Sequence, residues 1–178
     1  MNIVIIGPPG SGKTTQAQLL ADTLGVPHLN TGDLLYFASK GTDSEALKIK
    51  ESMATGQMVD EEIAEKQIKA YLEDHKDEKH IITDGFPRTI GQAKREIFNV
   101  DRAFYIKVGD VESAKRLMSR GRADDSEVVI KERLKVYHEE TEPVLEFYRQ
   151  KGVLEEIDGE RTIKEIAQEL ESRMNDTH

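Results

Sequence analysis

The sequence contains no cysteine, which excludes disulfide bridges, thiolate metal sites and cysteine nucleophiles together. Basic residues are also few relative to acidic ones: 25 Lys and Arg stand against 34 Asp and Glu, a formal charge of −9. The chain therefore lacks the basic excess typical of proteins that bind nucleic acids or anionic membranes. No apolar run approaches the ~20 residues that a membrane-spanning helix needs.

Repeats, low-complexity tracts and linkers rich in proline, glycine and serine are missing as well. The 178 residues therefore predict a single domain, 1–178, large enough for one hydrophobic core. The chain starts directly with an apolar run at residues 3–6, with no basic leader or cleavage site before it. We expect a cytoplasmic, monomeric protein with no nucleic-acid or membrane partner.

Short β-rich runs alternate with longer amphipathic stretches along the chain. The predicted strands are residues 3–6, 81–83, 103–108 and 153–157, with a weaker candidate at 28–29. The predicted helices lie near residues 13–24, 32–40, 44–55, 61–75, 90–98, 111–120, 126–151 and 162–174. Asp110, and Thr162 with Glu165, are predicted helix caps, and Pro143 predicts a kink or a break. This alternation is typical of an α/β protein with a parallel sheet covered by helices on both faces.

The strongest motif follows the first predicted strand. Residues 7–14 fit the phosphate-loop pattern G-x-x-x-x-G-K-[ST] and lead directly into a predicted helix. The glycines let successive backbone N–H groups surround an anion, and the helix N-terminus adds its positive end. Lys13 would reach the β- and γ-phosphates, and Thr14 or Thr15 would offer a hydroxyl towards Mg²⁺. The loop alone leaves ATPases, kinases and plain nucleotide binders open.

Four further groups of residues are ambiguous when taken alone. Asp84 follows a predicted strand, where ligands of parallel sheets bind, but residues 84–88 fit a turn equally well. Thr31 fits a helix N-cap as well as a ligand contact, and Thr89 with Gln92 fits a capping box. Four arginines, with Asp124 and Asp125 as possible partners, suit a polyphosphate but also a solvated helix; they are Arg116, Arg120, Arg122 and Arg133.

The histidines carry no metal-ligand spacing, so all five are interpreted as incidental. They are His28, His75, His80, His138 and His178.

Taken together, the motifs resemble those of the adenylate kinase family of nucleoside monophosphate kinases over nearly the whole chain. The residues that carry the resemblance are 7–17, 31–33, 56–59, 84–89, Gln92 and the arginines from 116 to 133. The resemblance implies a three-layer sandwich of the phosphate-loop NTPase type with a five-stranded parallel sheet. It also implies a helical acceptor-binding segment at about 30–59, a short lid at about 120–126, and the reaction ATP + AMP ⇌ 2 ADP with Mg²⁺.

The resemblance also implies roles for individual residues. Those implied for ATP binding are Gly10, Ser11, Gly12, Lys13, Thr14, Thr15, Arg116, Arg120 and Arg161. Those implied for AMP binding are Thr31, Gln57, Met58, Val59, Gly85, Phe86, Pro87, Arg88, Gln92, Arg122 and Arg133. Those implied for catalysis are Lys13, Asp84, Arg88, Arg120, Arg122 and Arg133. Mg²⁺ would be held by Thr14 or Thr15 and, through water, by Asp84, and no zinc site is expected.

Two positions depart from the family pattern. Only Gly121 separates Arg120 from Arg122, where long-lid members insert a domain, so the chain is similar to the short-lid form. Tyr36 stands where the family usually has an arginine that grips the acceptor phosphate. Thr89, where pyrimidine-specific relatives usually carry asparagine, favours AMP. A UMP/CMP kinase, another small-molecule phosphate-loop kinase, and a non-catalytic nucleotide-binding module stay open as alternatives.

Overall fold

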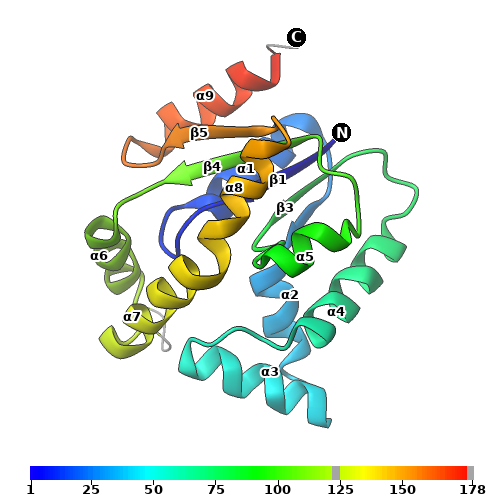
Figure 1. Ribbon diagram of the computed structural model, residues 1–178, viewed down its shortest axis with the longest axis vertical. Helices are drawn as coiled ribbons and strands as arrows, with labels where there is room; N and C mark the ends of the chain where they lie inside the picture. Colours follow the sequence, from blue (N-terminus) through cyan, green and yellow to red (C-terminus); the bar gives the residue numbers. More distant parts are fainter. Residues whose placement is uncertain (122–124, 176–178) are drawn as a thin grey trace.

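The computed structural model describes residues 1–121 and 125–175 of the chain. Five parallel strands form one sheet in the order β2-β3-β1-β4-β5 (Figure 1). Their bounds are β1 Asn2–Ile6, β2 His28–Asn30, β3 Ile81–Asp84, β4 Arg102–Lys107 and β5 Leu154–Asp158. Because β1 pairs with β3 on one side and β4 on the other, the strand order reverses at β1. Ligands of open parallel sheets bind outside the carboxyl ends of the strands at such a reversal.

Helices cover both faces of the sheet in the described part of the chain (Figure 1). Their bounds are α1 Lys13–Leu24, α2 Thr31–Ala38, α3 Ser44–Thr55, α4 Glu61–Asp74, α5 Ile90–Arg95, α6 Asp110–Arg120, α7 Glu127–Val136, the π-helical η1 Tyr137–Thr141, α8 Glu142–Gln150 and α9 Ile163–Asn175. Helices α1 and α9 pack on one face, and α5, η1 and α8 pack on the other. The predicted α/β three-layer fold with a five-stranded parallel sheet is confirmed.

Strand β1 shows why the apolar runs are unbroken. Ile3 and Ile5 pack with α1 and α9, whereas Val4 and Ile6 pack with α5 and α8. Because side chains alternate across a strand and both faces are covered, every position must be apolar. A separate cluster joins α2, α3 and α4 through Leu35, Ile49 and Ile63. This group of helices extends from the end of β2, below the sheet in Figure 1.

The long helix expected over residues 126–151 is interrupted, in line with the kink or break that Pro143 predicted. The interruption is a π-helical turn, the five residues of η1, and it lies upstream of the proline between α7 and α8. Proline has no N–H for the carbonyl four residues earlier and its ring clashes with that carbonyl, so the preceding turn widens to a π-helix. The capping box of Thr162 and Glu165 is confirmed, because each contacts the backbone N–H of the other.

Other boundaries differ from the sequence predictions. The N-cap of α6 is Gly109, and Asp110 is the first helical residue, so the cap predicted at Asp110 is wrong. The helix near 90–98 ends at Arg95, because Glu96 adopts a left-handed conformation with φ 42°. Thr31 does not cap α2: the side chain of Asn30 accepts the hydrogen bond from the Asp33 N–H, at 3.1 Å. The weak strand at His28 is confirmed and continues to Asn30.

Candidate functional site

The loop between β1 and α1 occupies the carboxyl end of the central strand. Gly10 and Gly12 have φ angles of 84° and 87°, which side chains rarely tolerate. A Cβ atom at Gly10 would also lie 2.5 Å from the backbone oxygen of Ser113, so the loop is packed directly against α6. The first turn of α1 contains no acidic residue. Its free N–H groups and positive helix end therefore face the loop, as an anion site requires.

Lys13 begins α1 and donates a hydrogen bond to the backbone oxygen of Pro8 at 3.4 Å. Burial lowers the pKa of the Lys13 ammonium to about 8; Asp84 opposes this shift, and three guanidinium groups add to it. Those groups belong to Arg88, Arg120 and Arg133. The structure therefore brings together four of the five cations predicted to surround the transferred group. The fifth, Arg122, lies outside the described residues.

A buried carboxylate holds two of these arginines. The Asp125 side chain accepts two hydrogen bonds from Arg120, at 2.8 and 2.9 Å, and one from Arg133 at 3.0 Å. Paired N–H···O bonds of this kind fix the direction of a guanidinium as well as its position. The pairing expected for Asp125 is confirmed, whereas Asp124 lies outside the described residues. Arg88 is placed by its own loop, through a 2.8 Å hydrogen bond to the Gly85 oxygen.

Asp84 ends β3 and its carboxylate lies beside the phosphate loop. It accepts hydrogen bonds from the Thr14 hydroxyl at 3.1 Å and from His28 Nε2 at 2.9 Å. His28, which the sequence left without a role, is thus a hydrogen-bond partner of Asp84, because its strand β2 pairs with β3. A hydroxyl beside a carboxylate supplies the hard oxygen donors that Mg²⁺ uses in nucleotide sites, where water and phosphates fill most positions. These two residues fit that ion.

A cavity next to Arg88 contains most of the residues predicted for the acceptor. It encloses about 280 Å³, with open solvent at its mouth included. Its walls are Thr31, Leu35, Met58, Val59, Ala64, Gly85, Phe86, Arg88 and Gln92. Leu35 and Ala64 are apolar wall residues that the sequence did not single out. The Thr31 hydroxyl is buried and has no hydrogen-bond partner among the described residues, so it is available to a ligand.

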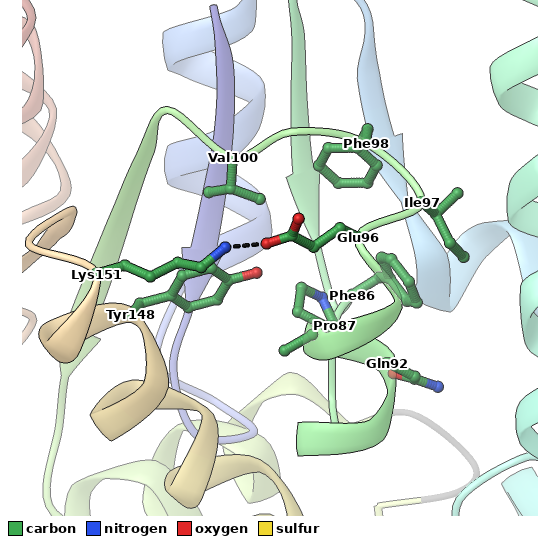
Figure 2. Close-up of a pocket in the computed structure, with 10 residues that line it drawn as sticks. Phe86, Pro87, Gln92, Glu96, Ile97, Phe98, Val100, Tyr148 and Lys151 are labelled. Carbon is green, nitrogen blue, oxygen red and sulfur yellow. Dashed lines mark hydrogen bonds and ion pairs between the residues drawn. The ribbon is translucent and has the colours of Figure 1, made fainter.

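Gln92 is held at this cavity by the start of α5. Its Oε1 accepts the Arg88 N–H at 2.7 Å, and its own N–H donates to the Thr89 hydroxyl at 3.1 Å. The capping box predicted from Thr89 and Gln92 is thus present, shifted by one residue because the glutamine side chain reaches Arg88. Gln92 also borders a second pocket, between α5 and the end of α8, which Phe86 and Pro87 line; Figure 2 shows the Gln92 side chain directed away from the Glu96–Lys151 ion pair there.

Gln57 does not line the cavity. Its amide donates a hydrogen bond to Glu132 of α7 at 2.6 Å. The preceding residue, Gly56, has φ 80°, and a Cβ atom there would lie 3.1 Å from the backbone oxygen of Val129. The end of the predicted acceptor segment therefore packs directly on the helix that carries Arg133.

Arg116 and Arg161 form a second group, at the loop between β5 and α9. Arg116 donates to the Gly159 oxygen at 2.9 Å, and Arg161 pairs with Glu169. Neither is among the charges that shift the pKa of Lys13.

Comparisons with known proteins agree with this site. The family model described as adenylate kinase matches residues 5–153. The chain is 39% identical over 174 residues to an adenylate kinase of Mycobacteroides abscessus, covering 93% of this chain and 94% of the relative. It is 39% identical over 176 residues to an adenylate kinase of Corynebacterium urealyticum, covering 94% and 96%. The chain belongs to the adenylate kinase family. It is therefore a nucleotide-binding phosphotransferase, and the family reaction moves a phosphoryl group reversibly from ATP to AMP, giving two ADP.

Adenylate kinases differ in length, and the comparisons show it. The alignment with the adenylate kinase of Archaeoglobus fulgidus covers 97% of both chains at 33% identity but extends over 211 positions, more than this chain contains. The alignment with the Mycobacteroides abscessus protein needs only 174 positions. This chain is therefore a compact member of the adenylate kinase family. No helix in the described part of the chain is both long and apolar enough to cross a membrane.

Proposed function

We propose that ATP binds with its phosphates on residues 10–15 and that AMP occupies the cavity lined by Thr31, Met58, Val59 and Gln92, so that the two meet beside Lys13. The observation that supports this arrangement is the convergence of Arg88, Arg120 and Arg133 on the Lys13 ammonium. Like charges repel one another, and the single carboxylate of Asp125 faces both Arg120 and Arg133, so this grouping favours a site that is completed by a highly charged anion.

In this arrangement the chain performs catalysis by positioning and by charge. Phosphoryl transfer spreads negative charge over the transferred group, which Lys13 and the guanidinium groups would neutralise. The AMP phosphate oxygen is already anionic, so no general base is required. Thr14 and, through water, Asp84 would hold Mg²⁺, which when bound neutralises charge on the ATP phosphates. Arg122, from the proposed lid, would join Arg88, Arg120 and Arg133 around the transferred group.

The proposed parts of the single domain follow from the same arrangement. Residues 30–59 would form the acceptor-binding segment and residues 120–126 a short lid whose closure excludes water, since water would otherwise accept the phosphoryl group. A monomeric state, a cytoplasmic location and the absence of nucleic-acid partners stay predictions.

Two substitutions test the site. Lys13→Ala and Arg88→Ala should each lower kcat by about 10²–10³-fold, because each removes a charge that stabilises the transition state. Circular dichroism and melting temperature show whether the fold is kept. Lys66→Ala, which removes an exposed cation paired with Glu45 on α3, is the matched control and should stay near wild type. Near-normal turnover in both site variants contradicts the proposal.

The acceptor assignment has its own test. Purified protein is assayed with ATP and, separately, AMP, GMP, CMP, UMP and a non-nucleotide alcohol, with ADP formation as the readout. AMP should give the highest kcat/KM. Turnover of another acceptor without turnover of AMP reverses the assignment, and ATP binding by calorimetry without any ADP formation indicates a binding module.

A further inference from the structure

We propose that Glu61 is a positioning residue for acceptor recognition, because its carboxylate, acting through Thr89, holds the first turn of α5, and with it Gln92, at the wall of the cavity. The inference rests on the proposed function, in which AMP occupies the cavity that Gln92 lines. Glu61 itself does not line the cavity. It is the first residue of α4, and it reaches across to the first turn of α5.

Hydrogen bonds connect Glu61 to the start of α5, where Gln92 lies. The Thr89 hydroxyl donates its single proton to Glu61, which leaves the lone pairs of the oxygen to accept the Gln92 N–H at 3.1 Å. The Arg88 N–H in turn donates to Gln92 Oε1 at 2.7 Å. A carboxylate only accepts and a backbone N–H only donates, so Glu61 takes the hydroxyl proton and leaves the Thr89 oxygen to accept at the start of α5. The Arg88 N–H then sets the orientation of the Gln92 side-chain amide.

The last bond determines which part of Gln92 is presented to a ligand. Since the Arg88 N–H occupies the amide oxygen, the amide NH₂ group is left as the available donor, and it makes no hydrogen bond within the described residues. Gln92 is buried. A fixed donor in a buried position recognises a base that has an acceptor atom on the facing edge, and it leaves other bases unpaired at a cost in affinity.

The surroundings of Glu61 keep its carboxylate in place. Arg95 donates to Glu61 and also to the buried Glu65, the latter at 2.5 Å. The hydrogen bond from Thr89 and, next, that from Arg95 hold the pKa of Glu61 below its usual value. The carboxylate is therefore ionised at neutral pH and acts as an acceptor throughout.

Glu61 is not required to cap its own helix. Asp60 performs that task, accepting hydrogen bonds from the N–H groups of Glu62 and Ile63 at 3.0 and 3.2 Å. Because Met58 and Val59 directly precede this turn, the Glu61–Thr89 bond joins two walls of the cavity, one ending at α4 and one beginning at α5. The distance between those walls sets the room for a base.

Three variants test the inference on the whole protein. Thr89→Val keeps the shape of the side chain and removes the hydroxyl, and Glu61→Ala removes the carboxylate. Each should raise the KM for AMP about tenfold, the effect of one lost hydrogen bond. The KM for ATP and the kcat should change by less than about twofold, since the phosphate groups are not touched. The preference for AMP over GMP and CMP should fall. Thr89→Ser keeps the hydroxyl and should restore the wild-type values.

A combined variant shows whether the two residues act in series. Adding Glu61→Ala to Thr89→Val should raise the KM for AMP no further, because Thr89→Val already removes the Glu61–Thr89 hydrogen bond. Lys66→Met, on the same helix but paired with Glu45, is the control and should leave both KM values unchanged. Equal rises in both KM values, or additive effects of the two changes, overturn the inference in favour of a merely structural contact.

Gln92→Ala separates this inference from the proposed function. If Gln92→Ala raises the KM for AMP while Thr89→Val and Glu61→Ala do not, the positioning role is wrong and the acceptor site stands. If Gln92→Ala itself leaves the KM and the base preference unchanged, the proposed acceptor site is wrong, and the positioning role falls with it.

Discussion

Asp125 and Arg133 form a hydrogen-bonded ion pair at 3.0 Å, and the Asp125 side chain is only 1% exposed. The same carboxylate binds Arg120, so one buried anion orients two of the cations that act on Lys13. Without it, two guanidinium groups would face a third cation with no fixed anion between them. The ion pair therefore helps to hold the guanidinium groups in place before a polyphosphate binds.

Replacing this anion should affect catalysis and stability together. Asp125→Asn should lower kcat by about ten- to a hundredfold, because both guanidinium groups lose their fixed direction. It should lower the free energy of unfolding by about 1–3 kcal/mol, less than for a fully buried pair because Arg120 is partly exposed. Steady-state kinetics and urea unfolding measure the two effects. Glu127→Gln, which breaks an exposed pair with Lys131 on the same helix, should change neither. Activity within twofold of wild type in Asp125→Asn contradicts the role of Asp125 in orienting Arg120 and Arg133.

The lowered pKa of Lys13 predicts a pH dependence. As the pH rises through about 8, the ligand-free enzyme loses the Lys13 charge, so kcat/KM for ATP should fall. In Lys13→Arg the side chain stays protonated, so the corresponding profile should be flat at a lower level. Rates at subsaturating ATP over the alkaline range test this. A wild-type profile without a fall, or an equal fall in Lys13→Arg, contradicts it.

The lowered pKa of Lys13 also affects stability: the free energy of unfolding should rise with pH in the range where kcat/KM for ATP falls. Below pH 8 Lys13 is protonated in the folded and the unfolded chain, and the cost of burying the cation is present in full. Between about pH 8 and the ordinary value of 10.5 the unfolded chain binds more protons, so the contribution of this group to stability improves as the pH rises. Lys13→Met should therefore be inactive but should melt above wild type at neutral pH without nucleotide. A lower melting temperature contradicts the assignment.

Gly10 should tolerate no side chain. Gly10→Ala adds a Cβ atom 2.5 Å from the Ser113 oxygen, so the loop or α6 has to shift. Gly25 also has a positive φ, 65°, but no neighbour within 4 Å, so Gly25→Ala measures the conformational cost alone, about 1 kcal/mol. Gly10→Ala should lose clearly more stability than Gly25→Ala and should weaken ATP binding. Equal melting temperatures and unchanged ATP binding in the two variants contradict the packing argument.

Tyr36 should limit the affinity for AMP. It lies on α2, 46% exposed, with the Lys40 ammonium 4.2 Å from its ring centroid. Tyr36→Arg should lower the KM for AMP about tenfold, because a charge-assisted hydrogen bond to the acceptor phosphate is worth ~1.5–3 kcal/mol. Phe37→Arg adds the same charge at the neighbouring, 71% exposed position and should have little effect. Equal effects of both substitutions indicate general electrostatic attraction instead.

The sequence predicted those features that short segments determine. The phosphate loop is a continuous motif, and strand β1 is recognisable because both of its faces are buried. The contacts of His28 with Asp84 and of Glu61 with Thr89 were not predicted. They join residues far apart in the chain, and they depend on strand order and on where α4 lies relative to α5, neither of which a local pattern specifies.

Helix boundaries were predicted less well, for a physical reason. The predicted helix near 90–98 ends at Arg95 because a glutamate, rather than a glycine, takes the left-handed position. Pro143 predicted an interruption of the long helix, but it predicted neither the π-helical form of η1 nor its position before the proline. Propensity indicates that a helix ends; the surrounding packing decides where.

Gly56 allows close contact between two parts of the site. Because it has no side chain, the segment that precedes α4 contacts α7 directly, and Gln57 is hydrogen-bonded to Glu132 beside it. The proposed acceptor-binding segment therefore packs tightly against α7, the helix that carries Arg133. A Cβ atom at Gly56 would lie 3.1 Å from the Val129 oxygen and 3.3 Å from Arg133 Cγ, so α7 would have to shift by a few tenths of an ångström. Such a shift would act on the proposed transfer of phosphate through Arg133 before it acted on the binding of either nucleotide.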